Sequence, residues 1–203
     1  NSFDTAPNYG RGTAEKYLGD VFEGSKEIII NTKCGSTIDN KKKFEFSDLE
    51  ISLVGSLERL KRDTVNVLYL HNPRNEAANL KDPIFFLKKQ KNNGIISNTG
   101  LSMAKDFNYN INQINSFDCV QNDVNLLYLK PILSHDYSQK KFHARSPLAT
   151  GLLSGNKNSK SSFNKNDYRS SWLKGKRLKS IMLRIKELEK LHNLPIKFLA
   201  MKF

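Results

Sequence analysis

The sequence has few of the features that mark secreted, membrane-spanning or metal-binding proteins. Two of its 203 residues are cysteine, too few for a disulfide framework, so reduced thiols are expected. No apolar run approaches the ~18 residues of a membrane-spanning helix, and no charged-then-apolar leader opens the sequence. No histidine and cysteine cluster has metal-ligand spacing, so no metal is expected. These absences favour a globular, cytoplasmic protein without a membrane partner.

Acidic residues are scarce in the last part of the chain. Residues 142–203 contain 14 Lys and Arg but 3 Asp and Glu, a net charge of +11, whereas residues 1–141 have a net charge of +2. Such asymmetry can indicate a polyanionic partner. Aromatic residues are not interleaved with the basic ones and no nucleic-acid-binding motif is present, so no nucleic-acid partner is expected. The basic surface is either simply solvated or attracts a phosphate-bearing ligand.

Strand-like and helix-like segments alternate along the sequence. The six predicted strands are 1–4, 27–33, 65–71, 95–101, 117–121 and 141–145. Because a helical crossover separates each strand from the next, the strands are expected to be parallel, with right-handed connections. The alternation predicts an α/β fold of the (β/α)8 TIM-barrel type, with six strand–helix units in this chain.

Local signals mark several expected helix ends. Thr13, Ser47 and Asp82 are the predicted N-caps, the second supported by Glu50 as a capping box and the third by the proline that follows it. The last long helix is predicted over 177–192, and a short helical segment begins at 195. Residues 156–174, rich in Asn, Ser and Lys, form a stretch longer than a simple loop between two elements of a compact domain, so this stretch is expected to be functional or disordered.

Four polar residues lie at, or just past, the C-terminal ends of the first three predicted strands: Asp4, Tyr9, Lys33 and His71. Strand ends of this kind converge on one face of a barrel. The residue types suit delivery of a proton to a substrate oxygen. Tyrosine is an available acid, an ammonium stabilises its phenolate, an aspartate keeps the ammonium charged, and a histidine orients the oxygen or joins the relay. No strong nucleophile stands beside a base, so acyl transfer is not expected.

The segments that carry these residues resemble the signatures of the aldo-keto reductase family. Its opening signature is similar to residues 3–10, FDTAPNYG, followed by 14–19, AEKYLG; its next two are similar to 31–35, NTKCG, and 69–73, YLHNP. The resemblance extends from Phe3 to about Ala200. It implies reduction of a small-molecule aldehyde or ketone to an alcohol, with Tyr9 as general acid, Asp4 and Lys33 tuning it, and His71 orienting the substrate.

The resemblance also implies a nicotinamide cofactor, NADPH with NADH as the alternative. The family holds it without a Rossmann glycine fingerprint, and none is present here. The residues that match its cofactor contacts are Ser102 and Gln121 at the nicotinamide amide, Arg145 beside the ring, and Ser146, Leu148 and Gly151 in the pyrophosphate loop. Two positions depart from the pattern. Met103 replaces an amide-binding asparagine, and Arg145 replaces an aromatic residue, although a guanidinium also stacks on a flat ring.

The family pattern begins one strand–helix unit earlier and ends one unit later than this sequence. Residues 1–203 are therefore interpreted as a single barrel domain that is incomplete at both ends, with two open parallel edges that favour association. The alternative to a reductase is a nucleotide-binding regulatory protein on the same fold with little turnover, or an inactive fragment. His135, His143 and His192 match no motif and are expected to be structural or at the surface.

Overall fold

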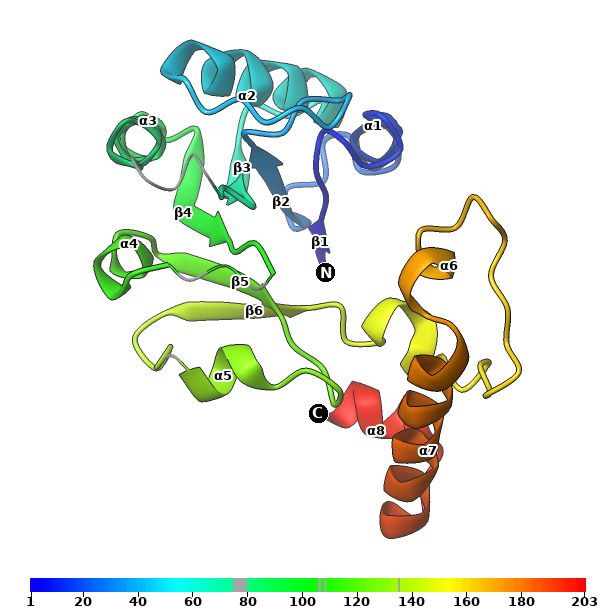
Figure 1. Ribbon diagram of the computed structural model, residues 1–203. Coiled ribbons are helices and arrows are strands. Elements are labelled where there is room, and N and C mark those ends of the chain that lie inside the picture. The colour runs from blue at the N-terminus through cyan, green and yellow to red at the C-terminus, as the bar shows by residue number, and fades with distance from the viewer. Residues whose placement is uncertain (75–79, 106, 108, 135) are drawn as a thin grey trace. The chain divides into compact units, whose positions relative to one another are not determined.

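The computed structural model describes residues 1–74, 80–105, 107, 109–134 and 136–203 (Figure 1). The chain divides into two compact units. The first comprises residues 1–122 and 137–143, and the second comprises residues 123–136 and 144–203. The interpretation of residues 1–203 as one domain stays a prediction.

One sheet contains the strands of the described chain, in the order of the sequence. They are β1 (Ser2–Asp4), β2 (Ile29–Cys34), β3 (Val65–His71), β4 (Ile96–Ser102), β5 (Cys119–Asp123) and β6 (Lys141–Arg145). The pairings from β1 through β5 are parallel, so their C-terminal ends share one edge; Lys33 lies opposite Tyr69, and His71 lies opposite Ser102. Parallel strands that follow one another in the sequence and are adjacent in the sheet must be joined by crossover connections, which here contain the helices. The predicted α/β fold of barrel type is confirmed.

The helices of the first unit cover one face of its strands (Figure 1). They are α1 (Thr13–Val21), α2 (Phe46–Leu60), α3 (Lys81–Asn92) and α4 (Ile111–Asn115). Alternation along β3 sends Leu68 and Leu70 into the apolar cluster shared with these helices. Val67, Tyr69 and His71 face the other way, so the polar and aromatic residues of the strands gather on the inner face of the sheet.

Three predicted helix N-caps are wrong. The residues before α1, α2 and α3 are Gly12, Glu45 and Leu80, and none of them makes a side-chain capping bond. Thr13 and Ser47 lie inside their helices, while Asp82 lies in the first turn of α3, where its charge still favours the helix N-terminus. A capping box does occur at α4, where Asn110 and Gln113 exchange side-chain and backbone bonds.

The second unit is mainly helical. Its elements outside the sheet are α5 (Lys130–Ser134), the 3₁₀ segment η2 (Ala149–Ser154), α6 (Arg169–Trp172), α7 (Gly175–His192) and α8 (Ile196–Lys202). Its core brings together Leu152 and Leu153 of η2, Met182 and Ile185 of α7, and residues of α8. The predicted helix over 177–192 begins two residues earlier, and the segment after 195 is helical as expected. No helix in the described ranges combines the length and apolar character of a membrane span.

Candidate active site

Lys33 and Asp4 form the buried centre of the candidate site. They lie on adjacent strands, and Lys33 Nζ donates to Asp4 Oδ2 and to the Thr5 carbonyl oxygen, both at 2.6 Å. The Lys33 side chain is fully buried, whereas 37% of the Asp4 side chain is exposed. Burial of an ammonium is tolerated only when it is paired and hydrogen-bonded. Asp4 therefore supplies the partner that a buried ammonium needs.

Tyr9 and His71 complete this cluster. Tyr9 follows β1 in a turn, and its ring centroid lies 4.8 Å from Lys33 Nζ. The His71 ring, at the end of β3, meets the Tyr9 ring edge-on with 6.0 Å between centroids. His71 is buried, while 38% of Tyr9 is exposed. The four residues predicted from separate strand ends thus gather at one place, with the tyrosine accessible to a ligand.

A chain of hydrogen bonds leads from Asp4 to the neighbouring strands. Gln121 Nε2 on β5 donates to Asp4 Oδ1 at 3.1 Å. The Ser102 hydroxyl at the end of β4 lies 3.1 Å from Gln121 Oε1 and 3.2 Å from Asn72 Oδ1, and these two acceptors share its single proton. Ser102 and Gln121 are both buried. Two residues predicted to contact a nicotinamide amide are thereby connected to Asp4, Gln121 directly and Ser102 through Gln121.

Asn72 also contacts this chain of hydrogen bonds, although it was not among the predicted site residues. It follows His71 directly, and its backbone N–H donates to the Ser102 carbonyl at 2.8 Å. Its φ of 51° is left-handed, a conformation that asparagine tolerates better than most residues. The signal was present in the sequence, because an asparagine immediately after a strand-end histidine presents an amide at the same edge.

Met103 turns away from this polar chain. It is buried in the apolar cluster of the first unit, where its sulfur accepts bonds from Asn122 Nδ2 at 3.5 Å and from the Tyr137 hydroxyl at 3.6 Å. The position that carries an asparagine in the family pattern therefore offers no amide to a ligand.

A second tyrosine–histidine pair lies on the inner face of the sheet. The Tyr69 hydroxyl bonds to His143 Nδ1. Burial raises the pKa of Tyr69, and nearby Cys119 and Asp4 raise it further, which favours the neutral phenol. His143 has this partner within the described chain, and His192 is an exposed residue at the end of α7. His135 lies outside the described residues.

The remaining predicted cofactor residues belong to the second unit. Asp123 holds two of them, because its Oδ1 accepts from Arg145 Nε at 3.0 Å and from the Ser146 hydroxyl at 2.7 Å. The Leu148 carbonyl accepts from the Gly151 N–H at 2.9 Å. Gly151 has a φ of 90°, so the turn requires glycine or a strained residue at this position.

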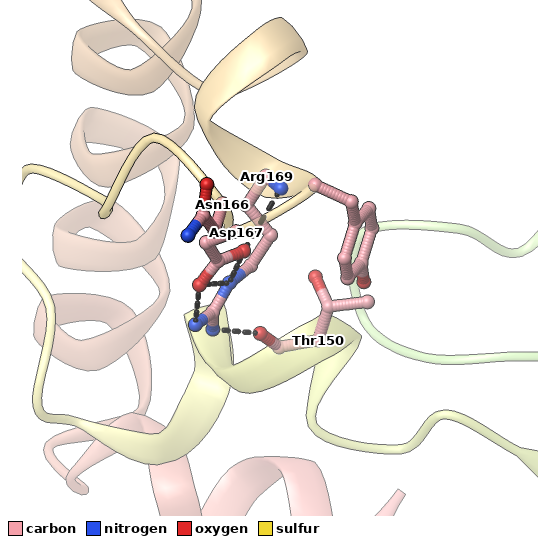
Figure 2. Close-up of a pocket in the computed structure, with 5 residues that line it drawn as sticks. Thr150, Asn166, Asp167 and Arg169 are labelled. Atoms are coloured by element: carbon pink, nitrogen blue, oxygen red, sulfur yellow. Dashed lines mark hydrogen bonds and ion pairs between the residues drawn. The ribbon is translucent and has the colours of Figure 1, made fainter. Parts of the chain in front are cut away.

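A hollow of about 580 Å³ opens beside this loop (Figure 2). Its lining includes Thr150, Asp167 and Arg169. Arg169 forms a bidentate ion pair with Asp167, in which its Nε lies 2.9 Å from Oδ1 and its Nη2 lies 2.5 Å from Oδ2. The Nη1 of Arg169 donates to the Thr150 carbonyl at 2.9 Å. Side-chain and backbone bonds from Arg169 lower the pKa of Asp167 to about 2. The pair ties the end of the 156–174 stretch to the loop at η2.

The two cysteines lie in the strands β2 and β5. Cys34 and Cys119 are free and buried, as expected, and burial raises the pKa of both thiols. Within the described ranges, no three His, Cys, Asp or Glu side chains gather where they could hold a metal ion.

Comparison with known proteins decides the family. The model of the Aldo/keto reductase family matches residues 1–203. The chain belongs to the aldo-keto reductase family.

Named relatives and solved structures agree with this assignment. An L-galactose dehydrogenase from Arabidopsis thaliana is 32% identical over 173 residues, which are 75% of this chain and 52% of that protein. A D-threo-aldose 1-dehydrogenase from a Pseudomonas species is 28% identical over 132 residues, 51% of this chain and 40% of that protein. The chain thus spans about half the length, or less, of these curated relatives.

Two solved aldo-keto reductase folds extend the comparison. A glycerol dehydrogenase from Gluconobacter oxydans superposes with a TM-score of 0.81 and 22% identity, covering 98% of this chain and 67% of its own. An aldo-keto reductase from Klebsiella pneumoniae in complex with NADPH gives a TM-score of 0.58 and 19% identity, covering 77% of this chain and 55% of its own. At these identities the likeness supports the fold.

Proposed function

We propose that this chain carries the proton-delivering site of an NAD(P)H-dependent reductase that converts an aldehyde or ketone to an alcohol. The observation that carries the proposal is the fully buried Lys33 ammonium, held by Asp4 and placed against the Tyr9 ring. A buried cation beside a tyrosine stabilises the phenolate left after proton transfer.

Each residue of the cluster has one proposed task. The Tyr9 hydroxyl gives its proton to the carbonyl oxygen, and Lys33 stabilises the resulting phenolate. Asp4 holds Lys33 in place and keeps it charged. His71, edge-on to Tyr9, orients the carbonyl oxygen. The cofactor supplies the hydride.

The donor set of the first unit fits a nicotinamide cofactor. A carboxamide needs an acceptor and a donor, and the buried amide of Gln121 beside the Ser102 hydroxyl offers both. In the second unit, Arg145 is proposed to lie beside the ring, and Ser146, Leu148 and Gly151 to hold the pyrophosphate. NADPH is the proposed form, because the Klebsiella relative was solved with it; NADH is the alternative.

The setting and substrate follow from the same considerations. The names of the plant and Pseudomonas relatives point to sugar substrates, which favours a small polyhydroxylated carbonyl compound here. Two buried, unpaired thiols suit a reducing, cytoplasmic setting.

The test is a reductase assay on the protein and its Tyr9→Phe variant. NADPH oxidation is followed with a panel of small aldehydes and sugars. The variant keeps the ring over Lys33 and loses only the acidic proton, so we expect turnover to fall ~10²–10⁴-fold while NADPH binding stays nearly constant. A residual rate above a tenth of the original would remove Tyr9 from this role.

A nucleotide-binding regulatory protein is the second candidate. Met103 favours it, because this residue is buried in the apolar core and leaves the carboxamide with one partner fewer than the family pattern provides. Under this alternative NADPH binds, no carbonyl compound is reduced, and Tyr9→Phe changes nothing measurable.

A further inference from the structure

Asp4 has two partners that belong to different parts of the proposed chemistry. Its Oδ2 accepts from Lys33, which serves the proton donor, and its Oδ1 accepts from Gln121, which serves the cofactor. One carboxylate therefore joins the two sets of residues. The pairing bridges 117 positions of sequence, from β1 to β5.

The contact with Asp4 determines which way the Gln121 amide points. A carboxylate only accepts hydrogen bonds, so the amide nitrogen must face Asp4. The amide oxygen then faces Ser102, whose hydroxyl donates to it. If the amide were reversed, its oxygen would lie against the Asp4 carboxylate, and two acceptors would face each other. The Ser102 hydroxyl could accept from a reversed amide, because it also has Asn72 Oδ1 to donate to. Asp4 is therefore the partner that enforces the observed orientation.

A fixed amide has a fixed polarity toward a ligand. With one N–H on Asp4, Gln121 keeps its second N–H for a ligand oxygen, and among the described residues none accepts that hydrogen. The backbone is held as well, because the Gln121 carbonyl accepts from the Met103 N–H at 2.8 Å. An amide that is locked in both position and polarity loses little freedom on binding, which favours affinity.

We propose that Asp4 is a positioning residue for the cofactor carboxamide as well as for Lys33, and that it acts by orienting the amide of Gln121. The inference rests on the proposed function and assigns Asp4 a recognition role that is separate from proton delivery. It compensates in part for Met103, because a locked Gln121 amide serves a carboxamide better than a freely rotating one.

The experiment measures binding without turnover. The probes are NADPH and 2′-phospho-ADP-ribose, which lacks the nicotinamide, and the quantity is the ratio of their dissociation constants in the intact chain. In Asp4→Asn the new amide can donate as well as accept, so Gln121 is no longer locked. We expect the preference for NADPH to fall about tenfold, a change of roughly 1.4 kcal/mol.

Lys33→Met is the matched control. It removes the other partner of Asp4 and leaves the contact with Gln121 in place, so the preference for NADPH should change less than twofold. Gln121→Glu is the second variant. It replaces the donor with an acceptor next to Asp4 and should abolish the preference even if Asp4→Asn does not fold.

The outcomes separate this inference from the proposed function. If the unsubstituted protein reduces no carbonyl compound but its preference for NADPH falls in Asp4→Asn, the reductase is refuted and the positioning role is supported. A preference that is insensitive to Asp4→Asn and to Gln121→Glu overturns the positioning role, whether or not reduction occurs. Equal losses in Asp4→Asn and Lys33→Met also overturn it, because the effect would then run through the ammonium. Absence of NADPH binding overturns both.

Discussion

At the scale of the residue, Lys33 is the fully buried cation of the site, paired with Asp4. We expect Lys33→Met to lower the reduction rate on the order of 10²-fold and to move the alkaline limb of the pH–rate profile to higher pH. The cause is that the phenolate of Tyr9 loses its neighbouring positive charge, so the hydroxyl gives up its proton less readily. The measurement is the rate of NADPH oxidation at saturating substrate from pH 6 to about 10, a range whose upper end is the reference pKa of a tyrosine side chain in a model peptide.

Lys33→Arg separates charge from shape in the same experiment. It keeps the positive charge, so its alkaline limb should stay closer to that of the unsubstituted protein, although its rate falls because a larger, planar guanidinium replaces a fully buried ammonium. An alkaline limb that is identical in all three proteins would show that Lys33 and Tyr9 are not coupled.

Asp118 makes a pH-dependent contribution to stability. Its Oδ2 accepts from the Thr99 N–H, the Thr99 hydroxyl and Lys91 Nζ at 2.9, 3.0 and 2.8 Å. Burial acts to raise the pKa of Asp118, but the bonds from Lys91 and Thr99 outweigh it and lower the pKa overall. A lowered folded-state pKa means that the contribution is present above the unfolded value of ~3.9 and is lost as the pH falls through the folded-state value.

Asp118→Asn is therefore expected to destabilise the protein by about 1 kcal/mol at pH 7, a modest figure because the carboxyl is partly exposed. Urea unfolding at pH 7 and near pH 3 is the measurement. The two proteins should differ at the higher pH and converge at the lower one. An equal difference at both values would mean that the charge of Asp118 is not what the bonds require.

At the scale of the element, the β3–β4 pair is fitted around one aromatic ring. Gly100 lies opposite Tyr69, and a Cβ placed there would lie 2.3 Å from Tyr69 Cδ1. We expect Gly100→Ala to cost about 1–3 kcal/mol of unfolding free energy, because the ring is fully buried and has nowhere to move. In a double-mutant cycle with Tyr69→Leu, the alanine should cost less, and simple additivity would contradict a clash with the ring.

Element bounds show what local sequence could and could not supply. The strands over 65–71 and 141–145 have the predicted bounds, since turn residues or charges flank both runs. The helix starts were predicted poorly, because a serine or threonine caps a helix only where the backbone at that residue is not yet helical. The helix α2 begins at Phe46, one residue before Ser47, and Phe46 packs against the core cluster. A cap is a local preference of about 1 kcal/mol, which packing overrides.

At the scale of the whole molecule, the order of the strand units was predictable and the connections between distant units were not. Asp4, Tyr9, Lys33 and His71 could be brought together from the sequence because parallel strands end at one edge. The contact of Gln121 with Asp4 and that of His143 with Tyr69 have no such signal. Both depend on which inner-face side chains meet across the sheet, and that is set by strand tilt and side-chain length.

The charge of residues 142–203 leads to the last prediction. Residues 142–203 carry a net charge of +11, and Lys160 and Lys165 are exposed in the stretch that Arg169 ties to the loop at η2. We expect NADPH binding by this chain to weaken severalfold between 10 and 100 mM salt, because the screening length falls from ~30 to ~10 Å over that range. Attraction by a diffuse surface charge is also unselective, so NADPH should be preferred over NADH only slightly.

Titration of both cofactors at several salt concentrations measures this effect. The double variant Lys160→Gln, Lys165→Gln should bind NADPH more weakly at low salt and show a shallower salt dependence. The matched control, Lys16→Gln with Lys26→Gln, removes two exposed charges from the first unit and should leave the slope nearly unchanged. Micromolar binding that is indifferent to salt, with a large preference for NADPH, would instead require a dedicated 2′-phosphate site, in which fixed partners and not the summed field of the basic surface hold the ligand.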